Sequence, residues 1–529
     1  MKMVHRLLSL FTLMAVLVLA GCSGDSGSST DGKDAEKATK EGKDIVIAVG
    51  STLTSMDPHD TNDTLSNSVQ KTVFEGLVGF DKDMNVIPVL AEDYSANDDA
   101  TEFTFTLHEN VKFHDGTDFN AEAVKVNFDR LSDPANGLKR NSLFSVIDKI
   151  EVVNDYEVKF LLSEPFGAMI NTFAHPSAMI HSPKSLEEHG KEVSKNPVGT
   201  GPYKFVEWKP GEGLEVTKNE DYRIDGQPKV DSISFKPVTE NGSRIAMLQT
   251  GEADFIYPVP TEQADSIDGK NGIEIDSKPS IIVRYMTVNT KKAPYDDLKV
   301  RQALNHAVDK EAFIKVVTNG HASVMDSIIA KDVQFYSEQE PFEFNVEKAK
   351  GLLAEAGYAD GFKAKLWGSN NSSATKAMEF LQQQLAQVNI EVEVVPMEAG
   401  TLSDKIWSVQ DSDDAEIEMY YGGWSPSTGD ADWAIRPLLG GADNFPPKSY
   451  NVSYYDNPQV NDLITAALET ADEDKRAEAY KEAQSLLWED APWINLSTEN
   501  TISGKKNYLK GIYLLPDGSL SVTDLEIVE

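Results

Sequence analysis

The sequence predicts a mixed α/β protein of two or more lobes, and three observations support this fold class. Segments typical of strands alternate with segments typical of helices along most of the chain. The length of 529 residues is enough for roughly three domains of about 150 residues each. A hydrophobic content of 40% with 9% aromatic residues is typical of a folded globular chain. No repeat of fixed period is visible, so a solenoid is not expected.

Strands are predicted where β-branched residues cluster or where polar and apolar residues alternate. Residues 44–49 form a short β-branched run that indicates a strand. Residues 102–107 alternate cleanly, which predicts a half-buried strand. Residues 151–162, with a break at Asn154 and Asp155, predict a hairpin.

Helices are predicted where apolar residues recur at helical spacing. The segments that show this spacing are 121–131, 300–319, 346–356, 374–388, 460–468 and 474–487. Asn345 and the run Asn371-Ser372-Ser373 are suited to cap the helices that follow them, and Gly357 is suited to end one.

The amino terminus predicts export and lipidation. Lys2 and Arg6 precede an apolar run over residues 7–20, whose length of about 14 residues is below the roughly 20 that a membrane-spanning helix needs. The only cysteine, Cys22, follows Leu19-Ala20-Gly21, a pattern that resembles a bacterial lipobox. Residues 1–22 are therefore predicted to be a lipoprotein signal peptide with the lipid on Cys22.

Residues 23–43 contain too few apolar side chains to form a core, and they predict a flexible tether. The net charge of the chain is 49 − 86 = −37. Such a chain repels nucleic-acid phosphates and anionic lipid headgroups, so membrane contact is expected through the lipid only. A single cysteine also excludes a disulfide framework and a Cys-rich metal site.

Several blocks, in order along the chain, resemble the extracytoplasmic solute-binding proteins of the peptide/nickel ABC-importer family, family 5. These blocks are residues 103–117 followed by Ala121-Glu122-Ala123-Val124 and Phe128; 199–203 with 219–222; 300–304 with 307–309; 349–358; and Gly423-Trp424. The first block combines a strand, a tight Asp-Gly turn and a helix start. Within the family the chain is most similar to glutathione-binding proteins, on residues 284–290, 382–388, 423–434 and 491–494.

The resemblance implies a two-lobed, periplasmic-binding-protein-like α/β fold with a hinge-closing cleft. Lobe one would combine residues 44–280 and 500–529 and would carry an inserted subdomain, and lobe two would span 281–499. The implied function is capture of glutathione or a closely related small peptide and delivery to the transmembrane subunits of an ABC permease. General di- or oligopeptide binding and nickel or haem binding remain alternatives, as does a lipid-anchored peptide sensor or chaperone.

Two arginines are candidates for binding the carboxylates of such a ligand, because a guanidinium donates two parallel hydrogen bonds to a carboxylate. Arg284 lies in the expected crossover strand and Arg436 follows a Trp-rich loop. A surface charge explains either position equally simply.

The segment from Trp424 to Trp433 supplies further candidate contacts. Its ligand-binding candidates are Trp424, Ser425, Ser427, Thr428, Asp430 and Asp432. The peptide binders that the family includes usually have an aspartate at the position of Ser427, where it holds the free amine of the peptide. Asp430 or Asp432 is the alternative partner for the ligand amine, although one of them is expected to cap the following helix. Trp424 is either a flat apolar wall of the site or a core side chain.

The loop after the first strand contributes Thr54 and Asp57, and the loop before the helix at 374 contributes Asn370. Turn formation and helix capping explain the same composition. No His-Glu-x-x-His motif, nucleophile elbow or phosphate-binding glycine loop is present, and the nine histidines are scattered. The sequence therefore predicts a binding protein, with no catalytic residue, no metal and no cofactor. We expect a monomer on the outer face of the cytoplasmic membrane of a Gram-positive-type envelope.

Overall fold

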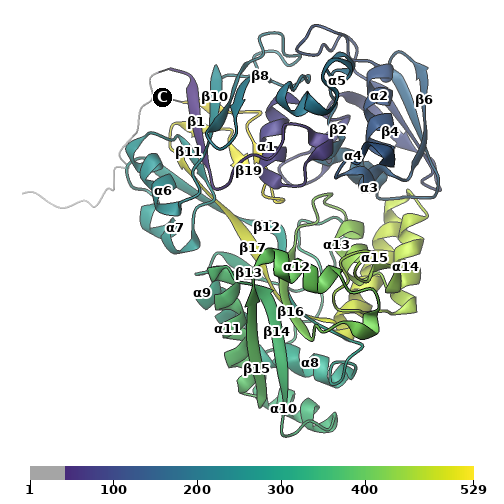
Figure 1. Cartoon of the computed structure of the whole chain (residues 1–529), viewed down its shortest axis with the longest axis vertical. Helices are drawn as coiled ribbons and strands as arrows, with labels where there is room; N and C mark the ends of the chain where they lie inside the picture. The colour runs from purple at the N-terminus through teal and green to yellow at the C-terminus, as the bar shows by residue number, and fades with distance from the viewer. Residues whose placement is uncertain (1–41, 529) are drawn as a thin grey trace, which may run out of the picture. The chain divides into compact units, whose positions relative to one another are not determined.

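The computed structural model describes residues 42–528, which belong to one compact unit of the chain. The signal peptide, Cys22 and almost all of the expected tether lie outside this range. Among the described residues, no helix combines the length and the apolar character needed to cross a membrane. The helices alternate with strands as the sequence predicts (Figure 1).

The largest sheet within residues 42–528 has 11 strands and is mixed in direction. Its strands, in spatial order, are β15 (Ile390–Met397), β14 (Phe362–Ser369), β16 (Met419–Trp424), β12 (Ile273–Val288), β17 (Trp493–Lys506), β11 (Phe255–Tyr257), β1 (Asp44–Val49), β10 (Ser232–Pro237), β9 (Gly213–Lys218) and β8 (Tyr203–Lys209), with β13 (Ala322–Val324) paired to β17 off this path. The β-branched run at 44–49 forms β1, as expected, because its side chains fill the pleated, buried centre of this part of the sheet.

Two long antiparallel strands, β12 and β17, connect the halves of this sheet (Figure 1). Their register runs from Ile273 opposite Lys506 to Thr287 opposite Trp493, and it is interrupted between Pro279 and Val283. On one side of the interruption β17 pairs with β11, and on the other side β12 pairs with β16. Two strands with a local break between them are a natural place for a hinge.

A second sheet is built from β4 (Ala91–Ala96), β5 (Glu102–Leu107), β7 (Glu157–Leu162) and β6 (Ile147–Asn154). The strand predicted at 102–107 and the hairpin predicted at 151–162 are both confirmed. Phenylalanines at 105, 128, 160 and 173 meet edge-on or tilted in the core beneath this sheet. The core has its own set of buried residues between Leu77 and Ile180.

Helices cover the sheets, and each sequence-predicted helical segment except 300–319 overlaps closely with one of them. They are α1 (Thr64–Val73), α2 (Ala121–Ser132), α3 (Asn141–Phe144), α4 (Met169–Ala174), α5 (Pro183–His189), α6 (Asn241–Thr250), α7 (Thr261–Ile267), α8 (Leu298–Ala307), α9 (Lys310–Val317), α10 (Val346–Glu355), α11 (Ser372–Ala386), α12 (Ala399–Trp407), α13 (Ala431–Leu439), α14 (Pro458–Leu468) and α15 (Glu473–Asp490). Asn345 and Asn371 cap α10 and α11 as predicted, and Gly357 follows the end of α10 with φ 89°.

The single helix expected over 300–319 is wrong, because the structure divides it into α8 and α9. Val308 and Asp309 adopt extended backbone between the two helices. The Asp309 side chain accepts a hydrogen bond from the main-chain N–H of Ala312, so it starts a new helix. Apolar spacing alone did not reveal this cap.

The carboxyl ends of parallel strands bring several loops to the same edges of the large sheet. β14, β15 and β16 are parallel and end at Ser369, Met397 and Trp424. β1 and β11 are likewise parallel and end at Val49 and Tyr257. Ligands of open α/β sheets bind at such edges, so the loops that follow these strands are where a site is expected.

Candidate functional site

A cavity of about 580 Å³ lies between the segment that follows β16 and the region between α3 and α4. Its size is within the range of small-molecule sites. The wall combines cationic, acidic, hydroxyl and aromatic side chains, among them Arg436, Lys448, Glu164, Tyr450 and Trp433. Such a mixed lining suits a small zwitterion, because each charge of the ligand can meet an opposite charge or several hydrogen bonds.

Trp424 ends β16 and forms part of the structure that supports this cavity. Its indole N–H donates to the main-chain oxygen of Trp433 at 2.8 Å. The Trp424 ring lies 5.8 Å from the ring of Trp433 and 5.0 Å from the ring of Tyr450. Trp424 is half-buried, whereas Trp433 and Tyr450 line the cavity directly. The tryptophan pair thus fixes the aromatic wall.

The start of α13 explains the two aspartates of the loop. Asp430 is the N-cap of α13 and accepts a hydrogen bond from the N–H of Asp432 at 2.8 Å. Its carboxylate is also bonded to Arg476 of α15 at 2.9 Å. Asp430 therefore has the capping role that the sequence predicts for one of the two aspartates, and it is completely buried.

Asp432 and Arg436, one turn apart on α13, form a two-bond ion pair. Arg436 donates from Nε at 2.7 Å and from Nη2 at 2.8 Å to the two carboxylate oxygens. The charge of Asp432 is the main reason why the pKa of Arg436 is raised further above its usual value. Arg436 lines the cavity and its guanidinium lies 5.7 Å from the ring of Phe166. Asp432 is thus paired with Arg436, and the Arg436 guanidinium remains a cationic group in the wall of the cavity.

The middle of the loop contacts the region around α4. His175 Nε2 lies 3.1 Å from Ser427 Oγ, and Asn171 donates to the main-chain oxygen of Thr428 at 3.2 Å. Ser425 accepts from the N–H of Ser427 at 2.9 Å through its main-chain oxygen. Thr428 lines the cavity, and Ser427 is half-buried beside it.

Arg140 is a cation that the sequence reasoning missed. Its Nε donates to the main-chain oxygen of Thr61 at 2.8 Å. Within residues 42–528 no carboxylate lies at ion-pair distance from its guanidinium. Burial lowers the pKa of Arg140, and the nearby Tyr450 and Asp63 act in the opposite sense. In the sequence, a Lys-Arg pair in a loop indicates a solvated surface. Only the tertiary structure shows that this guanidinium is half-buried and that no described carboxylate pairs with it.

Arg284 lies on β12 and is paired within the chain. Its Nε and Nη2 donate to the two carboxylate oxygens of Glu499 on β17 at 2.8 and 3.0 Å. Glu499 lines a separate cavity of about 310 Å³ with His321 and Lys376. Arg284 thus lies opposite Gly423 on β16 and is not among the residues that line the 580 Å³ cavity, and its carboxylate partner is supplied by Glu499.

Thr54 and Asn370 lie at two other strand edges. Thr54 is exposed, and its hydroxyl donates to Asp63 at 2.5 Å, which helps to hold the start of α1. Asn370 is exposed after β14, and its main-chain N–H donates to the oxygen of Met397 at 2.8 Å. Neither side chain lies among the residues that line the 580 Å³ cavity.

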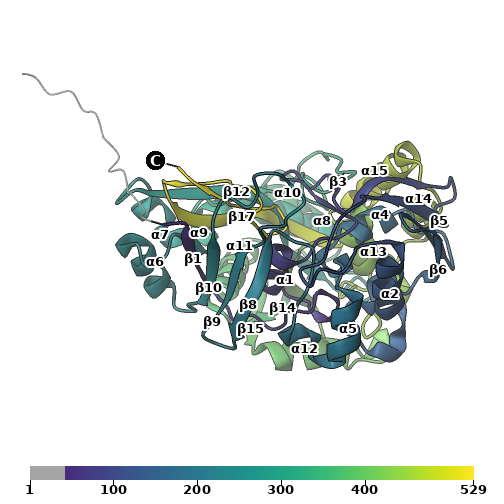
Figure 2. The same ribbon diagram turned by 90° about the horizontal axis from the view of Figure 1, so that it is seen from above.

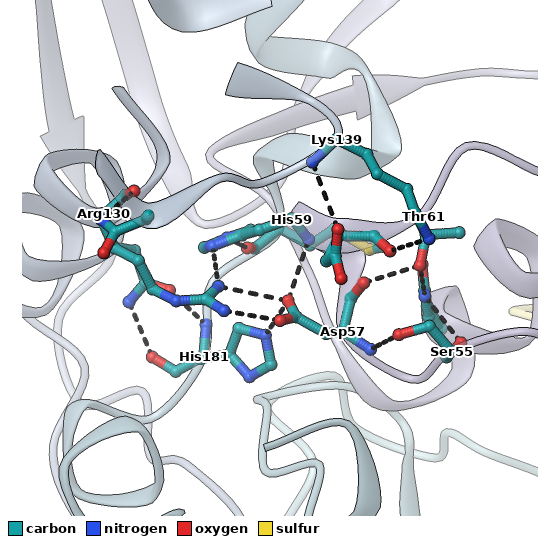
Figure 3. Close-up of polar contacts among 12 residues, drawn as sticks. Ser55, Asp57, His59, Thr61, Arg130, Lys139 and His181 are labelled. Carbon is teal, nitrogen blue, oxygen red and sulfur yellow. Dashed lines mark hydrogen bonds and ion pairs between the residues drawn. The ribbon is translucent and has the colours of Figure 1, made fainter. Parts of the chain in front are cut away.

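Asp57 is the centre of a buried polar cluster (Figure 3). Arg130 donates to its two oxygens at 3.2 and 2.6 Å, and His181 Nε2 lies 3.2 Å away. His59 accepts from Arg130 at Nδ1 over 2.7 Å and donates from Nε2 to the oxygen of Met179 at 2.9 Å. Burial alone would raise the pKa of Asp57, but hydrogen bonds from His181 and Arg130 lower it below the usual range.

This cluster also has the composition of a metal site, which scanning the sequence did not reveal because its members are far apart in the chain. One ligand atom each from Asp57, His59 and His181 lies within 4.8 Å of the others. The Arg130 guanidinium, however, already supplies the positive charge between Asp57 and His59 (Figure 3). The cluster therefore fastens the loop after β1 to α2 and does not fit a metal ion while Arg130 is in place.

Residues 85–446 match the family described as bacterial extracellular solute-binding proteins, family 5 Middle. The chain is 46% identical over 488 residues to glutathione-binding protein GsiB of Pectobacterium atrosepticum, covering 92% of this chain and 95% of that protein.

Two solved structures are also similar to the chain. HbpA2 from Haemophilus parasuis is 26% identical, with a TM-score of 0.82 over 92% of this chain and all of that one (100%). A dipeptide binding protein from Pseudoalteromonas sp. SM9913, in complex with Met-Leu, is 26% identical, with a TM-score of 0.75 over 92% of this chain and 100% of that one. These similarities confirm the two-lobed fold class that the sequence predicts.

Proposed function

The chain belongs to the bacterial extracellular solute-binding proteins of family 5, and we propose that it is the receptor of an ABC importer for glutathione or a closely related small peptide. Members of this family are binding proteins and not enzymes, as the sequence predicts for this chain. The observation that carries the proposal is the 46% identity, over 92% of the chain, to a glutathione-binding protein. The mixed lining of the cavity beside α13 is consistent with it.

Glutathione carries two carboxylates, one ammonium, two amides and a thiol. We propose that Arg140 and Arg436 attract its carboxylates, because both cations are half-buried and an arginine fork matches a carboxylate. Arg436 lines the cavity, and Arg140 lies two residues before Ser142, which also lines it. Ser427 and Thr428 would add hydroxyl groups, and Trp424, Trp433 and Tyr450 would hold the apolar centre of the peptide. Glu164 and Glu469, which line the same cavity, are carboxylates available to the ligand ammonium. Asp430 and Asp432 are already committed to Arg476 and Arg436.

We further propose that the protein closes around its ligand by bending β12 and β17. Lobe one would contain residues 44–280 and 500–529, and lobe two residues 281–499. Tyr508, Ile512 and Val522 pack with Ile45 and Ile47 in one core, which supports placing the carboxyl-terminal segment in lobe one. The register break at Pro279 supports the position of the hinge. A ligand can drive closure only as far as it binds the closed form better than the open one.

Outside the described residues, we propose a signal peptide over residues 1–22, a lipid on Cys22 and a tether over 23–43. The short apolar run and the position of the only cysteine support this proposal. The protein would then stand as a monomer on the outer face of a Gram-positive-type cytoplasmic membrane and deliver its ligand to permease subunits.

Calorimetric titration of the mature domain, unfolded and refolded to remove carried-over ligand, tests the proposal. Reduced glutathione, oxidised glutathione, Met-Leu, a pentapeptide and Ni²⁺ would be compared at one pH. Micromolar or tighter binding of glutathione, about −8 kcal/mol or better, with weaker binding of the others is the expected result. Preferential binding of Met-Leu would replace glutathione by a dipeptide, which the similarity to the dipeptide binding protein makes the second candidate.

A further inference from the structure

Hydrogen-bond contacts among Ser177, His175 and Ser427 connect a buried turn to the loop that follows β16. His175 and Ser177 are 1% and 0% exposed, respectively, and lie at the end of α4 and in the 3₁₀ turn Pro176–Ala178. The main-chain N–H of Ser177 donates to His175 Nδ1 over 3.1 Å, and the Ser177 hydroxyl lies 2.7 Å from the same nitrogen. On the other side of the ring, Nε2 lies 3.1 Å from Ser427 Oγ.

The direction of these hydrogen bonds follows from the chemistry of the groups. A main-chain N–H can only donate, so His175 Nδ1 must be the unprotonated nitrogen of the ring. A neutral imidazole then carries its hydrogen on Nε2 and donates it to Ser427 Oγ. Burial lowers the pKa of His175 well below its usual value, and the charges of Arg140 and Lys71 lower it further, so the ring is neutral near pH 7.

Ser427 is left with its own hydroxyl hydrogen. Among the described residues, its Oγ has no hydrogen-bond partner other than His175. Because that bond is donated by the ring, the hydroxyl hydrogen of Ser427 is available to an acceptor outside the chain. Ser427 is half-buried and precedes Thr428, which is among the residues that line the 580 Å³ cavity.

The charges around this position favour an anionic acceptor. Arg140 and Lys71 are the two cations that act on His175. Lys71 donates to Ser519 Oγ at 2.7 Å and also feels the charge of Asp517. Arg140 is influenced by the charge of Asp63, but within residues 42–528 no carboxylate is at ion-pair distance from it. A ligand carboxylate at Ser427 would thus accept a hydrogen bond from the hydroxyl in a region where the nearby charges that act on His175 are positive, and an ammonium there would be repelled by them.

We propose that Ser427 determines ligand specificity by donating its hydroxyl hydrogen to a carboxylate of the bound peptide, and that His175 is the positioning residue that fixes this direction. The inference deepens the proposed function and rests on it, because it requires a small peptide in this cleft. It assigns to this position the carboxylate end of the ligand and excludes its free amine.

Four variants separate the two roles. Ser427→Ala removes the donor and is expected to weaken glutathione binding about tenfold or more, as loss of a hydrogen bond to a charged group does. His175→Asn keeps an acceptor for the Ser177 N–H but places no donor near Ser427, so it should weaken binding to the same extent. The double variant should be no weaker than either single variant. His175→Gln, whose amide nitrogen extends toward the Nε2 position, should restore most of the affinity.

The chemical class of the contact is tested with the two monoethyl esters of glutathione, each of which removes one carboxylate charge. Ser427→Ala should weaken binding of free glutathione and of one monoester, and leave binding of the other unchanged. Equal losses for free glutathione and both esters would overturn the carboxylate assignment, and additive losses in the double variant would overturn the role of His175. His114→Asn is the matched control, because His114 bonds to the main-chain oxygen of Gly201 and not to the loop. Its affinity for glutathione should equal that of the wild type.

Failure of the proposed function would be recognised separately. If the wild type binds Met-Leu and not glutathione, the same variants are compared with Met-Leu and its carboxyl-terminal amide, and Ser427→Ala should weaken only the free acid. If neither is bound, the proposed function fails, and ¹⁵N NMR of the ligand-free protein decides the direction of the bond. A protonated Nε2 on His175 supports the inference, and a protonated Nδ1 overturns it.

Discussion

Asp430 and Arg476 form an ion pair of 2.9 Å in which both side chains are almost completely buried, 0% and 2% exposed. The pair joins the N-cap residue of α13 to α15, and the Arg476 guanidinium also lies 4.8 Å from the ring of Phe335. Arg436 lies on α13 and lines the cavity. By fixing the start of α13, the Asp430–Arg476 pair therefore determines the position of this cationic side chain in the cavity wall.

Arg476→Met is expected to destabilise the protein by about 3–5 kcal/mol, because it leaves the Asp430 carboxylate buried without its partner. Chemical denaturation monitored by tryptophan fluorescence measures the free energy of unfolding. Lys475→Met is the matched control, since Lys475 pairs with Asp472 on the exposed side of the same helix and should change stability by less than about 1 kcal/mol. A loss at Arg476 no larger than at Lys475 would contradict the structural role of the pair.

Arg140→Ala is expected to weaken glutathione binding by about 10- to 100-fold, because a half-buried, unpaired guanidinium is replaced by an apolar group. The affinity of Arg140→Lys for glutathione should lie between those of the wild type and Arg140→Ala, because an ammonium lacks the planar fork of a guanidinium. Calorimetry measures the affinities, and thermal unfolding checks that the fold persists. Lys139→Ala removes the neighbouring exposed cation and should leave affinity within about twofold; a loss equal to that of Arg140→Ala would indicate long-range attraction only.

Acidification from pH 6.5 to 4.5 is expected to destabilise the protein through its buried histidines. Burial lowers the pKa of His59 to about 3 and that of His114 to about 4. In this window the unfolded chain binds protons at these positions and the folded chain does not, so stability is full above pH 6.5 and falls as the pH decreases.

Each such histidine adds a slope of about 1.4 kcal/mol per pH unit. Free energies of unfolding measured across the window should therefore show a shallower slope for His114→Asn than for the wild type. His189→Asn, which changes a half-buried histidine on the last turn of α5, is the control. An unchanged slope in His114→Asn would show that His114 is protonated in the folded state.

Wild-type protein is expected to show no rise in melting temperature with Zn²⁺ or Ni²⁺, because the Arg130 guanidinium supplies the positive charge between Asp57 and His59 (Figure 3). Arg130→Ala should lower stability by about 3 kcal/mol or more, since it leaves Asp57 buried without a cation. Added Zn²⁺ should then recover part of this loss through Asp57, His59 and His181. If Zn²⁺ also recovered stability in the double variant Arg130→Ala with His181→Ala, this result would argue against the three-residue site.

The local predictions succeeded where one short segment decides the structure. The alternating residues at 102–107 formed β5, and Asn345, Asn371 and Asp430 capped the helices that follow them. They failed at Val308 and Asp309, where a cap interrupts a continuous apolar pattern. A side chain that accepts a hydrogen bond from the backbone N–H three residues later can start a new helix within a continuous helical pattern of apolar residues. The spacing of the apolar residues does not reveal that hydrogen bond.

The sequence alone identified the α/β fold class, the resemblance to solute-binding proteins and the loop from Trp424 to Trp433. Only the tertiary structure decided which side chains are committed to partners within the chain. Arg284 meets Glu499 across 215 residues, and Arg436 meets Asp432, while Arg140 has no carboxylate at ion-pair distance among the described residues. In Figures 1 and 2, α4 and α14 lie on the same side of the described unit, where the N–H of Gly167 donates to Leu468 at 2.8 Å.

Ser427 is the clearest case of this division. Its identity was visible in the sequence, but the direction of its hydrogen bond depends on His175, 252 residues earlier in the chain. Periodicity and capping act over a few residues, so the sequence determines them directly. The pairing of charges and the direction of a hydrogen bond depend on side chains that only folding brings within about 3 Å of one another.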